Sequence, residues 1–144
     1  MKNFGSHFEY EKQRNDDLMR CYREHLSRRP FIHLPEVLED IVNSPSARFW
    51  VSEERAAIVM SQMMRGDQLE KMRPLKREMF QEIYKRVMML KEEHPDWPLS
   101  QLAFEVVRQP APKFYLTPGS AKVIISKIRR QWYEERKKKL RFMW

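Results

Sequence analysis

The sequence predicts an all-α protein made of two tandem three-helix repeats, with an extended basic helix at the C-terminal end. Residues 37–65 align without a gap on residues 102–130, and six of the 29 positions are identical, Pro45 and Pro110 among them. Three glycines and ten methionines in 144 residues are typical of a helical chain. The net charge of +8 is concentrated near the C-terminus. We therefore expect one small helical module used twice.

The offset of 65 residues between the aligned segments predicts two modules, residues 1–68 and residues 69–144. An apolar content of 42% is sufficient for a folded chain. A module of this size buries only a thin core, so we expect the two modules to pack together or the chain to self-associate.

The first repeat is predicted to hold a long helix, a short helix and a third helix that follows a proline-broken link. Pro35 opens the short helix, because proline suits the first helical position. Ser52 is a favourable N-cap for the third helix, and Gly66 is a favourable end. The expected helices cover residues 10–26, 35–43 and 52–65.

The second repeat follows the same plan. Thr117 is the expected N-cap of its third helix, with Pro118 at the first helical position. Two aromatic residues follow the proline in each link, and we expect them to fill the core: Phe49 with Trp50, and Phe114 with Tyr115. The expected helices cover residues 74–93, 99–109 and 117–140.

Several classes of protein are not indicated. The single cysteine, Cys21, excludes an internal disulfide framework and favours a reducing, intracellular setting, so we expect a cytoplasmic protein. No apolar run approaches the roughly 20 residues of a membrane span, and the first residues lack a signal-peptide core.

Chemistry-bearing motifs are also missing from the sequence. The four histidines have no metal-ligand spacing, and no phosphate-cradling loop or hydrolase motif occurs. Adjacent acids such as Asp16 and Asp17 point about 100° apart on a helix, so they do not converge on one substrate. We expect no enzymatic activity, no cofactor, no metal and no small-molecule substrate.

The charge is unevenly distributed along the chain. Residues 120–144 hold nine Lys and Arg against two acidic residues, which is +7, and residues 1–119 carry the remaining +1. Such a basic segment indicates contact with a polyanion, of which nucleic acid is the usual example. The alternative is a solvated tail that only confers solubility.

A three-helix unit whose last two helices are joined by a link resembles the trihelical helix-turn-helix proteins. Its tandem use is similar to Myb-like and other two-module DNA-binding proteins. The short, basic chain with a lysine-rich end also resembles accessory DNA-binding proteins of phages and mobile elements. This resemblance implies duplex DNA as the partner and the third helix of each repeat as the recognition helix.

The two candidate recognition helices differ in charge. Glu53 and Glu54 at the start of the first would be repelled by phosphate, whereas the second has no acid before Glu134. We therefore expect the second repeat to bind DNA and the first to support it or to bind protein. The expected DNA-contacting residues are Lys113, Thr117, Ser120, Lys122, Lys127, Arg129, Arg130, Arg136, Lys137, Lys138, Lys139 and Arg141. An ordinary solvated helix face is the alternative for Lys122 and Lys127.

Two other functions are consistent with the sequence. A protein-interaction or assembly module, such as a phage structural or inhibitory protein, is suggested by a methionine-rich segment that would otherwise fill the core: Met60, Met63, Met64, Leu69 and Met72. An RNA-binding protein is suggested by aromatic residues that would stack on unpaired bases: Trp132, Tyr133, Phe142 and Trp144. Packing against the first helix of its own repeat, residues 74–93, is the alternative for Trp132.

Overall fold

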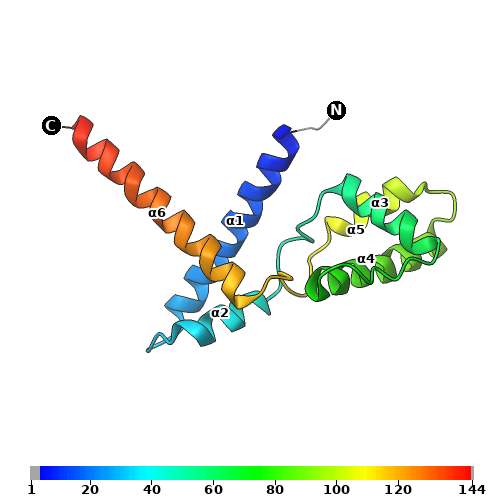
Figure 1. The fold of residues 1–144 in the computed structure, drawn as a ribbon, viewed down its shortest axis with the longest axis horizontal. Helices are drawn as coiled ribbons and strands as arrows, with labels where there is room; N and C mark the ends of the chain where they lie inside the picture. The colour runs from blue at the N-terminus through cyan, green and yellow to red at the C-terminus, as the bar shows by residue number, and fades with distance from the viewer. Residues whose placement is uncertain (1–3, 144) are drawn as a thin grey trace.

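The computed structural model describes the backbone of residues 4–143 and the side chains of residues 10–143. Within residues 4–143 the regular structure is helical, and the all-α expectation is confirmed (Figure 1). The helices are α1 (Phe4–Ser27), α2 (Leu34–Val42), α3 (Glu53–Met64), α4 (Pro74–Glu93), α5 (Leu99–Val107) and α6 (Pro118–Phe142).

The predicted starts and ends of the helices agree closely with the structure. The Ser52 hydroxyl accepts a hydrogen bond from the Arg55 amide, 3.1 Å, as expected of an N-cap. Gly66 follows α3 with a φ of 99°, a conformation that glycine adopts without strain. The one large difference is that α1 begins at Phe4 rather than at residue 10. The ends of α5 and α6 each differ from the expected residue by two.

The helices form two lobes, and these lobes do not follow the sequence repeat. One hydrophobic core is formed by α1, α2 and α6, here named the terminal lobe, and the other by α3, α4 and α5, here named the central lobe (Figure 1). The third helix of each repeat therefore packs on the first two helices of the other repeat. Three-helix units confined to residues 1–68 and 69–144 are not what the helix packing shows.

The two links between the lobes pair with each other where they cross. Ser46 and Ala111 form an isolated antiparallel bridge, with N–H to O=C distances of 3.0 and 3.1 Å. Both residues are buried, and they occupy equivalent positions of the two repeats. The chain thus has an internal approximate two-fold relationship at the point where its two halves exchange helices.

The aromatic residues of the links fill the cores as expected, but each pair is divided between the lobes. Phe49 is buried in the core of the central lobe and Phe114 in that of the terminal lobe. The next residue in each link turns the other way, so Trp50 packs against the terminal lobe and Tyr115 against the central lobe. Neither link is regular extended backbone here, because the Val51 amide donates to the Phe49 carbonyl at 2.9 Å around Trp50 and Tyr115 has a φ of 57°.

A buried carboxylate attaches the first link to α1. The Asp17 side chain accepts hydrogen bonds from the Ala47 amide (2.8 Å), the Trp50 indole N–H (3.2 Å) and the Arg20 guanidinium (2.8 Å). The bond to Asp17 raises the pKa of Arg20. Asp17 is buried and Asp16 is exposed, so the two adjacent acids do diverge.

Candidate nucleic-acid interface

The long helix α6 has a buried inner face only in its first half. Ala121, Ile125 and Ile128 are buried against α1 and α2, as the expected apolar stripe required. From residue 129 to residue 143 the side chains are exposed. Figure 1 shows that this second half of α6 diverges from α1 and extends beyond the rest of the terminal lobe.

The basic side chains of α6 are all exposed, and none of them forms an ion pair with any side chain of residues 10–143. An α-helix of 25 residues is about 37 Å long, so these charges are spread along an extended rod. The residues concerned are Lys122, Lys127, Arg129, Arg130, Arg136, Lys137, Lys138, Lys139 and Arg141.

The helical periodicity divides most of these charges into two rows. Lys122, Arg129 and Arg136 are seven residues apart and follow the edge of the buried stripe, here named the inner row. The opposite side of the helix carries the outer row, which consists of Lys127, Arg130, Lys137 and Arg141. The cations of the outer row form no ion pair with a described side chain, although the exposed Glu134 lies on the same side of the helix. With four cations against one carboxylate, this side of α6 keeps a net positive charge that is available to a polyanion.

Three residues predicted to contact DNA have other partners. The Lys113 ammonium lies 2.6 Å from the Glu78 carboxylate of α4, so its charge is compensated within the central lobe. The Thr117 hydroxyl accepts from the Ser120 amide at 3.0 Å and donates to the Ser120 hydroxyl at 2.9 Å. The backbone N–H of Ser120, in the first turn of α6, is therefore already hydrogen-bonded to the Thr117 side chain and does not need a phosphate as acceptor.

A helix-turn-helix pair within the second repeat is not formed. The short helix α5 packs on α3 and α4, and α6 packs on α1 and α2. The short helix that packs on α6 is α2, which belongs to the first repeat. The exchange of helices at the Ser46–Ala111 bridge is the physical reason.

At the start of α3, the acidic residue Glu53 forms ion pairs with arginines, whereas Glu54 is exposed. Glu53 lies 3.3 Å from the Arg48 guanidinium and 3.7 Å from that of Arg108. Arg48 also donates to the Val51 carbonyl at 2.9 Å. These contacts hold the first link, so Arg48 has a structural role in the central lobe.

A groove of about 380 Å³ lies between α1 and α6. Trp132 lies in this groove, and the Arg23 guanidinium of α1 is 4.8 Å from its ring centre. Trp132 thus contacts α1 and not the helix at residues 74–93 that sequence reasoning assigned to it. The lining residues are Met19, Tyr22, Arg23, Leu26, Arg129, Trp132, Tyr133 and Arg136.

Arg23 is not among the candidate binding residues selected from the sequence, because no local sequence pattern distinguishes it. Arg23 lies in a helix with many charges of both signs, and its importance comes from lying beside Trp132. That contact depends on the packing of α6 against α1, which the repeat did not predict.

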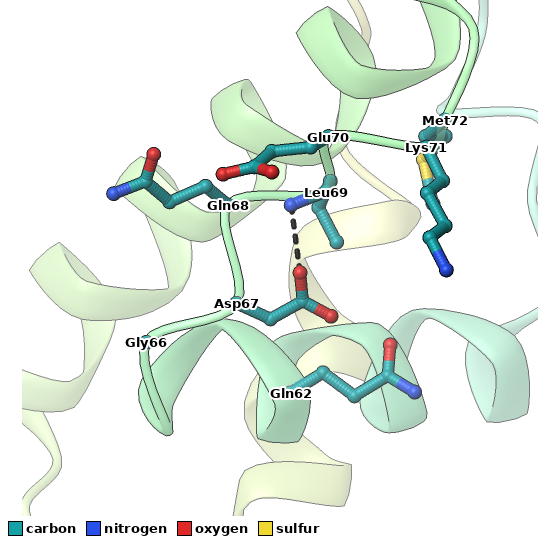
Figure 2. A pocket seen from close by; sticks show the side chains of 8 residues that line it. All are labelled: Gln62, Gly66, Asp67, Gln68, Leu69, Glu70, Lys71 and Met72. Atoms are coloured by element: carbon teal, nitrogen blue, oxygen red, sulfur yellow. Dashed lines mark hydrogen bonds between the residues drawn. The ribbon is translucent and has the colours of Figure 1, made fainter.

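A second hollow, of about 530 Å³, lies beside the connection from α3 to α4 (Figure 2). Its shape comes from Gly66 and Leu69, both with positive φ, and from the Asp67 carboxylate, which accepts from the Leu69 amide at 2.8 Å. Figure 2 shows that the Glu70 and Lys71 side chains point in different directions. They do not converge on a common bound group, and we assign no chemistry to this hollow.

The methionine-rich segment belongs mainly to the core of the central lobe. Met60 and Leu69 are buried there, and Met63 and Met72 pack against it. Met64 alone of the five is exposed. These methionines therefore fill space between helices of the two repeats.

Two further features are missing from the part of the chain that the structure describes. None of its helices combines the length and apolar character needed to cross a membrane. Within the same residues no group of three or more histidine, cysteine or acidic side chains is placed to hold a metal ion. Comparison with protein-family models, with curated proteins and with solved structures found no significant match.

Proposed function

We propose that this protein binds duplex DNA, without catalysis, through the exposed basic surface of α6. The observation that carries the proposal is the outer row, whose four cations form no ion pair with the side chains of residues 10–143 and follow one side of a long helix. Phosphates along a duplex are spaced regularly, and each neutralised phosphate releases counterions. Lysine and arginine position a protein on DNA more often than they specify a sequence.

In this proposal the two lobes have different roles. The terminal lobe holds the first half of α6 by its buried face, which leaves the outer row directed at the ligand. The central lobe has compensated charges at Lys113 and Glu53, and it supports the terminal lobe or binds a protein partner. An accessory role of the phage or mobile-element kind, inside the cell, is what the resemblance implies.

The test is the affinity for random-sequence duplex DNA across a salt series. The variant Lys127→Glu/Arg130→Glu/Arg141→Glu reverses three charges of the outer row. It is expected to lose at least tenfold in affinity, with a salt slope smaller by about three, because each phosphate contact contributes about 0.9 to that slope.

A matched control changes the net charge equally at another place. Lys71, Lys76 and Lys85 are exposed in the central lobe and form no ion pair with the described side chains. The variant Lys71→Glu/Lys76→Glu/Lys85→Glu is expected to keep most of the wild-type affinity. Equal losses in the two variants would mean that only net charge matters, and absence of wild-type binding at micromolar protein would refute the proposal.

A protein partner or self-association is the second candidate, and one observation favours it. Phe31 and Ile32, in the turn between α1 and α2, have exposed fractions of 86% and 61%. Adjacent exposed apolar side chains are typical of contact surfaces. Sedimentation of the wild type and of Phe31→Ser/Ile32→Ser tests this candidate, since a monomer for both proteins would exclude self-association through this turn.

A further inference from the structure

The groove between α1 and α6 combines aromatic rings with arginines. Trp132 and Tyr133 retain exposed fractions of 43% and 60%, although they are large apolar side chains. Met19 and Tyr22 of α1 are buried and give the groove an apolar base. A flat, partly exposed aromatic surface over an apolar base is suited to stacking with another ring.

The charges around this groove are all positive. Arg23, Arg129 and Arg136 line it, and no carboxylate does. On the other side of Trp132 a hollow of about 320 Å³ is lined by residues that include Glu11 and Asp16. Of these two hollows, the one lined by arginines without a carboxylate is the one suited to an anion.

The aromatic rings and arginines of the groove together fit a ligand that has a flat ring and an anionic group attached close to it. A volume of about 380 Å³ lies within the range of about 300–1,000 Å³ found for small-ligand pockets. Nucleobases stack on tryptophan, tyrosine and the arginine plane, and the adjoining phosphates bind arginine. Bases in an intact duplex are covered by their neighbours, so the base must be unpaired.

We propose that the α1–α6 groove binds an unpaired base of single-stranded DNA, with its flanking phosphates at Arg129 and Arg136. This inference rests on the proposed DNA binding by α6. Arg129 and Arg136 of the inner row line the groove, and the outer row lies on a different, solvent-facing side of the same helix. One helix would therefore contact both a duplex and a strand that leaves it. The preferred ligand is duplex DNA that carries a single-stranded tail.

The test uses fluorescence anisotropy with labelled oligonucleotides and the full chain. An oligothymidylate of about 15 nucleotides is compared with an abasic strand of equal length, which keeps the phosphates and lacks the bases. Wild type is expected to bind the oligothymidylate roughly tenfold more tightly than the abasic strand, as one or two stacked bases would give. Equal affinity for the two strands would overturn the proposal.

The variants identify the rings that stack. Trp132→Leu keeps an apolar side chain beside Arg23 and is expected to abolish the preference for the strand with bases. Tyr133→Ala, at a more exposed position, is expected to reduce it severalfold without affecting the fold. The matched control is Phe142→Ala, because Phe142 is 91% exposed on α6 and does not line the groove. An equal loss in Phe142→Ala would overturn the assignment to the groove.

Two further ligands show whether the proposed duplex binding or the proposed single-strand site is wrong. Blunt duplex DNA tests the proposed function alone: its binding should be unaffected by Trp132→Leu and reduced by the three outer-row substitutions. If wild type does not bind blunt duplex DNA but still prefers the strand with bases, the proposed duplex binding is wrong and the groove remains a single-strand site. An oligouridylate bound more than tenfold more tightly than oligothymidylate would assign the groove to RNA and overturn the DNA assignment.

Discussion

Phe49 and Phe114 occupy equivalent positions in the two repeats, and each donates its backbone N–H to the end of the short helix of the other repeat. The Phe49 amide donates to the Val107 carbonyl of α5, and the Phe114 amide donates to the Val42 carbonyl of α2, both at 3.0 Å. Together with the Ser46–Ala111 bridge, these bonds make the crossing of the links symmetric. Each lobe depends on both halves of the chain.

The exchange of third helices predicts how two fragments behave. Residues 1–68 contain α1, α2 and α3 but lack α6, and residues 69–144 lack α3. Each fragment therefore leaves apolar helix faces without their intramolecular partner. We expect an equimolar mixture to gain helical circular-dichroism signal beyond the sum of the separate fragments and to form a one-to-one complex. Two stable helical monomers that gain nothing on mixing would contradict the exchange.

Removal of the Asp17 carboxylate is expected to destabilise the protein by about 3 kcal/mol in Asp17→Ala. The change leaves the Ala47 amide and the Trp50 indole N–H without their acceptor, and the Arg20 guanidinium loses a partner. Urea unfolding measures the loss. Asp16→Ala is the matched control, since Asp16 is exposed and its removal should change stability by less than about 0.5 kcal/mol.

Cys21 is expected to report the opening of the terminal lobe. Its side chain is 3% exposed in the core of that lobe, and burial raises the pKa of its thiol. A buried thiol that resists ionisation reacts slowly, so aromatic disulfide reagents should modify Cys21 much more slowly in native protein than in urea. Rapid modification of the native protein would show that the terminal lobe opens readily.

Stability is expected to fall as the pH rises from about 10 to about 12. Burial raises the pKa of Tyr10 and of Tyr115, each to about 12, from an ordinary value of 10.0. Between these values the unfolded chain has lost protons that the folded chain still holds, so the free energy of unfolding decreases with pH. The stability that the two protonated tyrosines contribute is fully present below pH 10 and is lost as the pH rises through about 12.

Lysines also titrate in this range, so the measurement needs a variant that lacks the two hydroxyls. Urea unfolding of wild type and of Tyr10→Phe/Tyr115→Phe is compared at pH 9 and at pH 11.5. The variant should lose less stability than wild type between the two pH values. An identical loss in both proteins would assign the pH dependence to other groups.

Local features of the fold could be predicted from short-range signals. Ser52 and Thr117 cap their helices as expected, because a hydroxyl beside the first free amides is a local interaction. The buried stripe of α6 was also predicted in outline, since its helical spacing is independent of the partner. The exposed basic side chains of α6 follow from the same spacing.

The candidate groove could not be predicted in the same way. Trp132 and Arg23 are more than one hundred residues apart, and their contact exists only because α6 packs on α1. The repeat suggested a different partner for Trp132. The engagement of Lys113 with Glu78 was equally invisible, because ion pairs between distant segments have no local pattern.

The sequence by itself determined that the chain is helical, where most helices begin and end, and that two similar sets of three helices exist. Only the tertiary structure decided which third helix joins which pair. The reason is that the competing helices present equivalent faces: Ala56 and Met60 of α3 correspond to Ala121 and Ile125 of α6, and all four are buried. Equivalent faces give no local signal for one pairing over the other, and in the structure the links cross at Ser46 and Ala111 so that each third helix joins the other repeat.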